Sequence, residues 1–263
     1  MTAPAPTLRR HSRFASAFLD LKRDLTVYLP PGYEKGGDPL PVLYMHDGQN
    51  LFEPDRAHVR GQHWRAGETL DELIADRLVP PFLIVGIDNT GTSRIHEYTP
   101  TKDSRLGGGL AGRYGRFIVE EVKPFIDRTY RTRTDAAGSA LGGSSLGGLV
   151  SLYIGFTHPS VFGSIAAMSP SVWWDRRMIL STIRRTRPRP PLRIWTDMGT
   201  AEGRRALDDA RMLKAALVGA GWTPGADLHY AEYEGATHSE TAWAGRFGAV
   251  VRWLFGRAHN GAP

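Results

Sequence analysis

One serine of this 263-residue sequence lies in a pattern that is typical of a catalytic nucleophile. Gly143, Ser145 and Gly147 are spaced as G-x-S-x-G, the pattern of a strand-to-helix turn that exposes the serine hydroxyl. Glycines suit the flanking positions because so tight a turn leaves no room for neighbouring Cβ atoms. Centring the pattern on Ser144 would put Leu146 where the second glycine belongs. The sequence therefore predicts Ser145 as the nucleophile, against the alternative of a glycine-rich structural loop.

A serine hydroxyl is a weak nucleophile at neutral pH, so a histidine must take its proton and later return it to the leaving group. In α/β-hydrolases the partners follow in the order serine, acid, histidine. Three of the nine histidines come late enough in the chain. His229 falls inside a predicted strand and His259 in the C-terminal tail. His238, in the loop after that strand, is the predicted general base.

Two carboxylates could orient the imidazole of His238. Glu202 lies in a loop past the end of a predicted strand, and Asp197 lies within that strand. We favour Glu202 and keep Asp197 as the alternative. The oxyanion of the reaction needs two N–H donors. The N–H of Leu146, directly after the nucleophile, is the first, and the second should come from residues 47–50, the loop after an early buried strand.

These residues must be positioned by strands and helices that alternate along the chain. Apolar and alternating runs predict strands at residues 7–17, 21–30, 41–46, 82–88, 162–168, 192–198 and 227–233. Apolar residues at helical spacing predict helices at 64–78, 114–130, 149–158, 205–220 and 241–257. This alternation predicts one domain over residues 1–263, a mostly parallel, doubly wound sheet flanked by helices, with frayed tails at 1–6 and 258–263. Together with the nucleophile pattern, it predicts the α/β-hydrolase fold.

Composition narrows the function classes. Without cysteine, a thiolate nucleophile, a disulfide and a cysteine-bound metal are excluded. Neither an H-E-x-x-H pattern nor an acidic cluster is present, so we expect no metal and no cofactor. No apolar run is long enough to span a membrane, and the first ten residues do not resemble a secretory signal. We expect a soluble, cytoplasmic protein.

The net charge of +6 raises the question of an anionic partner. The densest basic run is 184–193, and no aromatic residues interleave with it, so we interpret it as a solvated loop and expect no nucleic-acid partner. The glycines of 107–112 match G-x-G-x-x-G, but no predicted strand leads into them, so a dinucleotide site is not expected.

Several further segments together resemble the putative-esterase family of α/β-hydrolases, which includes enterochelin-esterase-like, feruloyl-esterase-like and esterase D-like enzymes. The segments that carry the resemblance are 46–50, 87–89, 94–100, 124–131, 142–148, 169–171 and 173–174. It covers residues 25–254. The resemblance implies a triad of Ser145, Glu202 and His238, with the second oxyanion N–H at Gln49.

Five side chains near these segments could line an acyl or aromatic pocket: Trp64, Arg94, Tyr114, Trp173 and Trp174. The alternative is that the aromatic residues pack in the core and that Arg94 pairs with Glu97. His46 is expected to pack at the end of its strand.

The ordered triad predicts a serine carboxylic-ester hydrolase that works on a small-molecule ester through an acyl-enzyme. An acyltransferase of the same fold, or a hydrolase-fold binding protein that has lost catalysis, are the alternatives. The sequence leaves open the natural ester, which could be acyl, hydroxycinnamoyl, siderophore or thioester, and the oligomeric state.

Overall fold

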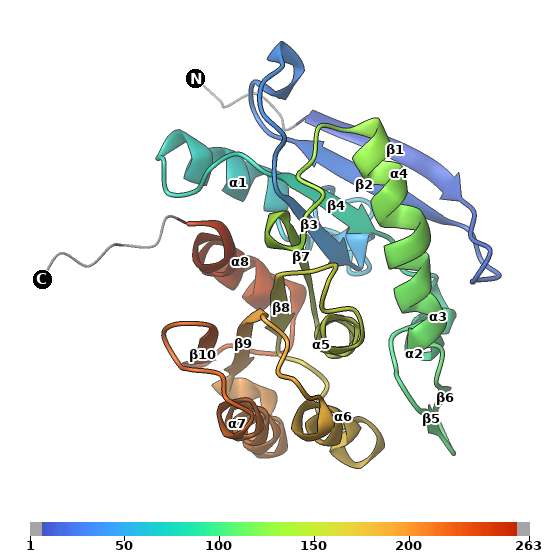
Figure 1. Cartoon of the computed structure of the whole chain (residues 1–263), viewed down its shortest axis with the longest axis vertical. Helices are drawn as coiled ribbons and strands as arrows, with labels where there is room; N and C mark the ends of the chain where they lie inside the picture. The colour runs from blue at the N-terminus through green and yellow to red at the C-terminus, as the bar shows by residue number, and fades with distance from the viewer. Residues whose placement is uncertain (1–6, 257–263) are drawn as a thin grey trace, which may run out of the picture.

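The computed structural model describes residues 7–256, and an eight-stranded sheet runs through their middle (Figure 1). The strand order is β1-β2-β4-β3-β7-β8-β9-β10. The bounds are β1 Thr7–Phe14, β2 Arg23–Leu29, β3 Val42–His46, β4 Leu83–Ile87, β7 Ser139–Ser144, β8 Ser164–Met168, β9 Arg193–Gly199 and β10 Leu228–Tyr233. The six strands from β4 to β10 are parallel, while β2 pairs antiparallel with β4 and β1 antiparallel with β2. The predicted α/β-hydrolase fold is confirmed.

The central strands are continuous apolar runs because helices cover both faces of the sheet. Every residue of β3 and of β4 is buried. The helices are α1 Ala66–Ala75, α2 Arg94–Glu97, α3 Ala111–Arg116, α4 Lys123–Thr129, α5 Leu146–Thr157, α6 Trp174–Arg185, α7 Arg204–Gly219 and α8 Glu240–Phe255. A π-helical segment, Phe117–Val122, joins α3 to α4. Short 3-10 turns lie at Tyr33–Lys35, Gly48–Asn50, Gly91–Ser93, Ala136–Gly138 and Thr200–Glu202.

The helices divide into two layers. Helices α1 and α8 lie on one side of the sheet, where Leu70, Trp243 and Phe247 belong to one apolar core cluster (Figure 1). The helical stretch 111–129 and helices α5 to α7 bury their apolar side chains in a second cluster, which includes Phe117 and Leu149. The first layer includes α8, the helix that follows β10, and the second includes α5, the helix that begins directly after β7.

Helix α6 was not expected from the sequence. Its apolar stripe is short, with only Ile179, Leu180 and Ile183 buried besides Trp174. Arginines dominate the rest of the segment, so the 3.6-residue period of apolar side chains is weak. The predicted basic loop therefore begins inside a helix, since Arg184 and Arg185 are its last two residues.

The long polar loop before α3 also contains structure that the sequence did not indicate. It holds α2 and a small hairpin of β5 (Lys102–Asp103) and β6 (Gly107–Gly108). Gly107 and Gly108 have φ values of 78° and 94°, and a Cβ on Gly108 would lie 2.2 Å from the Thr99 hydroxyl. These glycines thus serve a tight hairpin, in the left-handed region that glycine adopts most readily.

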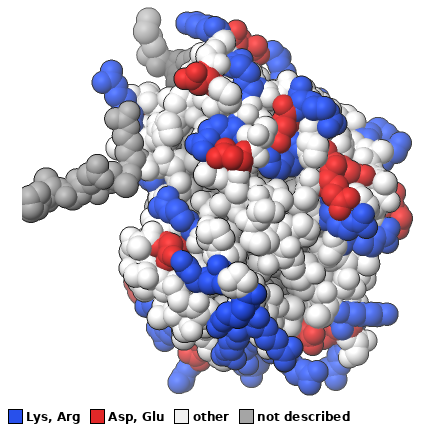
Figure 2. All heavy atoms as spheres, viewed as in Figure 1, with Lys and Arg blue, Asp and Glu red and all other residues white. Residues whose placement is uncertain are grey.

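The surface is rich in basic side chains near the end of the molecule where α6 and α7 lie (Figure 2). Arg184, Arg185 and Arg187 are exposed there. Within residues 7–256, no helix combines the length and the hydropathy that crossing a membrane would need. The predictions for the tails at 1–6 and 258–263, and for His259, lie outside the described residues.

The parallel strands place distant parts of the chain at one edge. The carboxyl ends of β3, β7, β9 and β10 lead into residues 47–50, Ser145, Glu202 and His238. In an open α/β sheet, ligand sites gather at this edge because the loops that follow parallel strands meet there. The candidate site is built from these loops.

Candidate active site

Ser145 occupies the turn between β7 and α5 with a backbone that few residues adopt. Its φ of 57° and ψ of −122° are unfavourable for a residue with a Cβ atom. A Cβ on Gly143 would lie 3.0 Å from the backbone carbon of Gly147, and one on Gly147 would lie 3.3 Å from Cβ of His46. The two glycines of the pattern are therefore required by close backbone packing around Ser145.

The structure brings Ser145, His238 and Glu202 into one chain of hydrogen bonds. Ser145 Oγ lies 2.9 Å from His238 Nε2, and His238 Nδ1 lies 2.6 Å from Glu202 Oε2. Since the carboxylate can only accept, Nδ1 carries the proton and Nε2 is left to accept from the serine hydroxyl. The side chain of His238 is 46% exposed, whereas that of Glu202 is 1% exposed. A half-exposed imidazole is thus oriented by a buried carboxylate.

The carboxylate of Glu202 is held in its charged form. Its Oε1 accepts from Ser169 Oγ at 2.6 Å and from the Gly199 N–H at 2.9 Å. Burial raises the pKa of Glu202, but the hydrogen bonds from His238, Ser169 and Gly199 outweigh it and hold the pKa below its ordinary value. A charged Glu202 can stabilise the imidazolium that forms when His238 takes a proton.

Asp197 has different partners. Its Oδ1 accepts from Arg246 Nη1 at 2.9 Å and from the Ser169 N–H at 3.1 Å, and its Oδ2 accepts from Trp195 Nε1 at 2.8 Å. Both oxygens are engaged away from His238. Of the two carboxylates that the sequence left open, the structure places Glu202 against the histidine.

Two residues of α8 contact the predicted triad and were missed in the sequence. Trp243 Nε1 and Arg246 Nη2 each donate to Ser169 Oγ at 3.1 Å, and Ser169 in turn donates to Glu202. The ring of Trp243 also packs edge-on against the ring of His238, with centroids 4.8 Å apart. A signal was present, because Arg246 interrupts the apolar stripe of a predicted helix, and a buried arginine there needs an acidic partner.

The loop after β3 carries the predicted second oxyanion donor. Gln49 lies in the 3-10 turn Gly48–Asn50, and Leu146 is the first residue of α5. The first N–H groups of a helix have no acceptor within it, so they are free to bind an anion. The Gln49 side chain accepts from the Asn89 N–H at 3.1 Å, which ties this turn to the end of β4.

Arg94 is paired with a residue of the same loop. Its Nε and Nη2 donate to the two carboxylate oxygens of Asp47, both at 2.7 Å, and Asn89 Nδ2 donates to Asp47 Oδ1 at 2.7 Å. The expected alternative, a pair between Arg94 and Glu97, is wrong because the buried Arg23 takes both oxygens of Glu97. Burial raises the pKa of Asp47, but Arg94 and Asn89 outweigh it and hold that pKa below its ordinary value.

Two cavities open beside the nucleophile. The first, of about 490 Å³, is the Arg94 cavity, lined by Asp47, Asn50, His58, Asn89, Gly91, Thr92, Arg94, Ser144, Ser145, Glu240 and Trp243. The second, of about 460 Å³, is the Trp173 cavity, lined by Ser169, Pro170, Ser171, Trp173, Met198, Glu202, Arg205, Ala206, Asp209 and His238. Ser171 Oγ lies 3.3 Å from Ser145 Oγ. Ser145 therefore lines the Arg94 cavity, and its hydroxyl contacts two residues of the Trp173 cavity, Ser171 and His238.

Three of the five predicted pocket residues belong to the core. The side chains of Trp64, Tyr114 and Trp174 line neither cavity, and these residues are 3%, 0% and 0% exposed. Each polar tip has a partner inside the protein: Glu240 for Trp64, His46 for Tyr114 and Thr101 for Trp174. The pocket prediction is wrong for these three. Trp173, in contrast, is 50% exposed and lines the cavity named after it.

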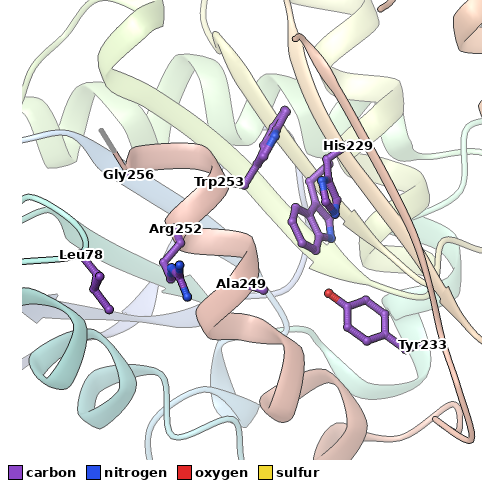
Figure 3. A pocket seen from close by; sticks show the side chains of 8 residues that line it. Leu78, His229, Tyr233, Ala249, Arg252, Trp253 and Gly256 are labelled. Atoms are coloured by element: carbon purple, nitrogen blue, oxygen red, sulfur yellow. The ribbon is translucent and has the colours of Figure 1, made fainter. Parts of the chain in front are cut away.

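The other histidines near strand ends have structural positions. His46 is buried beneath the Ser145 turn and shares a hydrogen bond with the Tyr114 hydroxyl at 2.9 Å. Burial lowers the pKa of His46 to about 3, so it stays neutral. His229 stacks on Trp195 in a separate cavity of about 400 Å³ between β10 and α8, which contains none of the predicted catalytic residues (Figure 3). Among residues 7–256, no cluster of His, Asp or Glu has the arrangement of a metal site.

Comparison with known proteins gives one family and several relatives. Residues 16–254 match the model of the Esterase family, described as "Putative esterase". The uncharacterized protein YbbA of Bacillus subtilis is 26% identical over 248 residues, covering 89% of this chain and 93% of its own. The ferri-bacillibactin esterase BesA of the same organism is 33% identical over 168 residues, covering 57% of this chain and 52% of its own.

Solved structures show the same architecture. The enterobactin esterase FES from Shigella flexneri superposes with a TM-score of 0.79 at 20% identity, covering 96% of this chain and 59% of that one. At this identity the likeness concerns the fold alone.

Proposed function

Because this chain belongs to the esterase family and is a carboxylic-ester hydrolase, we propose that it works as a serine esterase with a triad of Ser145, His238 and Glu202. The observation that carries this proposal is the pair of hydrogen bonds that links Ser145 Oγ through both nitrogens of His238 to Glu202. Asp197 is left out of the triad because its oxygens are used by Arg246, Trp195 and Ser169.

In the first half of the reaction, His238 Nε2 takes the hydroxyl proton while Ser145 Oγ bonds to the ester carbonyl carbon. The carbonyl oxygen becomes an oxyanion, and the N–H groups of Leu146 and Gln49 donate to it. The C–O bond to the alcohol then breaks, and the alcohol leaves with the proton from His238. The product is an acyl-enzyme on Ser145.

In the second half, His238 takes a proton from water as the water oxygen attacks the acyl carbon. The bond to Ser145 Oγ breaks, and the proton returns to the serine. The carboxylic acid is released. Glu202 stays charged throughout and stabilises the imidazolium in both halves.

The two cavities support a division of the substrate on either side of the scissile bond. Trp173 offers an exposed aromatic face, which favours an aromatic or apolar group in its cavity. Arg94 and the amides around it favour a polar group in the other. An ester whose acyl part carries an aromatic group fits this division, and hydroxycinnamoyl esters belong to that class.

The test of the triad is hydrolysis of a short p-nitrophenyl ester together with covalent labelling by a fluorophosphonate. The wild type should turn over the ester and take the label on Ser145, and Ser145→Ala should lose both by a factor of about 10³ or more. Ser160→Ala is the matched control, because Ser160 is exposed on a loop outside the site. Unchanged turnover in Ser145→Ala would reject the proposal.

A further inference from the structure

Glu240, the first residue of α8, joins the segment that carries His238 to the loop that carries Gln49. Its Oε1 accepts from Asn50 Nδ2 at 3.0 Å, and its Oε2 accepts from Trp64 Nε1. The residue is mostly buried and lines the Arg94 cavity together with Ser145. It stands only two positions after His238. One carboxylate therefore bridges three parts of the chain at the edge of the reaction site.

Both the oxygen and the nitrogen of the Asn50 side-chain amide have partners. Its Oδ1 accepts from the His58 N–H at 2.9 Å, and its Nδ2 donates to Glu240. The backbone carbonyl of Asn50 accepts from the Trp64 N–H at 2.8 Å. Since Asn50 is 4% exposed, a lost partner would leave a polar group buried and unpaired. Asn50 is thus fixed at its side chain and at its backbone.

Gln49 lies between two anchors. On one side its own side chain accepts from the Asn89 N–H, and on the other Asn50 is held by Glu240. The turn itself is closed by the Asn50 N–H to Asp47 O at 2.9 Å and the Leu51 N–H to Gly48 O at 3.2 Å. A donor stabilises a developing oxyanion only if its direction is set before the reaction. The Glu240 bridge adds a constraint on that direction from the side of α8.

We propose that Glu240 is a positioning residue for the oxyanion hole. By bridging Asn50 and Trp64, Glu240 fixes the direction of the Gln49 N–H. It also fixes the position of that N–H relative to His238. This inference rests on the proposed function, because it assigns a role within that site. Glu240 itself transfers no proton and forms no bond with the substrate.

The chemistry of the bridge explains why a carboxylate stands in so buried a place. Burial, together with the nearby Asp47 carboxylate, raises the pKa of Glu240 to about 7 despite the hydrogen bond from Trp64. A glutamine would avoid this cost of a buried charge. The N–H donors of Asn50 and Trp64, however, bind two different oxygens of Glu240, and a glutamine would put an N–H₂ donor in place of one of them. A carboxylate presents an acceptor to each donor.

The carboxylate of Glu240 and the amide of Asn50 can be exchanged between the two positions without changing the net charge. This exchange gives a sharp test. In Glu240→Gln, the new amide N–H₂ faces the Nδ2 of Asn50, so one hydrogen bond is replaced by two opposed donors. In Asn50→Asp, two carboxylates face each other. In the double variant, the amide nitrogen at position 240 can donate to the carboxylate at position 50, while the amide oxygen at position 240 accepts from Trp64. The carboxylate at position 50 can still accept from the His58 N–H, so every hydrogen bond of the wild type has a counterpart.

We expect each single variant to lower kcat for a p-nitrophenyl ester about tenfold or more, with KM changed less than twofold. The reason is that a misplaced Gln49 N–H weakens a hydrogen bond that forms only in the transition state. The double variant should recover to within about threefold of the wild type. Glu120→Gln, at an exposed carboxylate on the π-helical segment, is the control and should leave kcat unchanged. A double variant as slow as the product of the two single losses would overturn the proposal.

Amide hydrogen exchange gives a readout that does not need turnover. The amides of residues 50 and 51 should exchange faster in each single variant and return toward the wild-type rate in the double variant. Equal exchange in all four proteins would overturn the positioning role even if the ester is hydrolysed. A wild type that neither hydrolyses esters nor takes the fluorophosphonate would reject the proposed function, while the exchange rates would still decide whether Glu240 holds the loop.

Discussion

The two cavities beside Ser145 differ in how their polar side chains are held. In the Arg94 cavity, Asp47 is bound by Arg94 and Asn89, and Glu240 is bound by Asn50 and Trp64. At the floor of the Trp173 cavity, Ser169 and Glu202 are joined by a hydrogen bond, but its outer wall is open. There Trp173 is half exposed, and among the ion pairs of residues 7–256 none includes the exposed Arg205.

This difference separates the parts of the site that must be fixed from those that can adapt. Donors for an oxyanion need a set direction, and the Arg94 cavity supplies it through charges and amides with their partners in place. A solvent-exposed side chain can change its rotamer to fit different substrates at little cost in free energy. We therefore expect changes in the Arg94 cavity to alter stability and kcat, and changes in the outer wall of the Trp173 cavity to alter KM.

The largest effect should come from breaking the ion pair of the Arg94 cavity. Asp47→Asn leaves the guanidinium of Arg94 unpaired at a site where the two side chains are only 24% and 9% exposed. Removing one partner of a buried pair costs about 3–5 kcal/mol, so urea unfolding should show a loss of that size together with a large loss of kcat. Asp135→Asn is the control, since its pair with Arg133 is exposed and should contribute about 0–1 kcal/mol. Equal losses in both variants would contradict the comparison.

The region of the Arg94 cavity should also make the free energy of unfolding depend on pH under acidic conditions. His46 lies beneath this cavity, and its pKa of about 3 compares with the ordinary 6.5. As the pH falls below 6.5, His46 becomes protonated in the unfolded chain but stays neutral in the folded chain. The free energy of unfolding therefore decreases as the pH falls. Between pH 6.5 and 4 this amounts to roughly 3 kcal/mol.

The measurement is the free energy of unfolding as a function of pH for the wild type and for His46→Gln, which does not titrate. The variant should show a shallower fall below pH 6.5, whatever its stability at neutral pH. Parallel curves for the two proteins would remove His46 from the explanation.

On the open side, Trp173→Ala should mainly weaken substrate binding. Removing a half-exposed indole from the cavity wall takes away about 1–2 kcal/mol of apolar contact with a bound aromatic group, which corresponds to roughly a tenfold rise in KM. Steady-state kinetics with a hydroxycinnamoyl ester and an acetyl ester should show the rise for the first and little change for the second. Val218→Ala, an exposed apolar side chain on α7, is the control. A fall in kcat for both esters would mean that Trp173 positions the reacting groups, contrary to this expectation.

The smallest effect is expected for Arg205→Ala. An exposed guanidinium attracts an anionic substrate weakly, by less than about 1 kcal/mol, so KM for a carboxylated ester should rise at most a few-fold and the rise should fade in high salt. Arg204→Ala is the matched control, since Arg204 is the exposed neighbour that does not line the cavity. An equal change in the two variants would show that only the overall charge matters.

Local rules allowed the sequence to determine much of this protein. The G-x-S-x-G pattern predicts Ser145 as the nucleophile, because a Cβ atom on Gly143 would crowd the backbone of Gly147 within the turn itself. The buried strands followed from continuous apolar runs, and the doubly wound sheet from their alternation with helices. His238 followed from chain order, since a loop after the last strand must end at the same edge of the sheet as Ser145.

Tertiary structure alone decided which side chains meet. Glu202 and Asp197 lie five residues apart at the end of β9, and the local sequence does not decide which of them contacts His238. The outcome depends on Arg246 of α8, which binds Asp197 and leaves Glu202 to contact His238. The same holds for the tryptophans: adjacent residues 173 and 174 face solvent and core. The bridge of Glu240 to Asn50 spans 190 residues. Such contacts are set by how helices pack on the sheet, and a one-dimensional pattern carries no record of that packing.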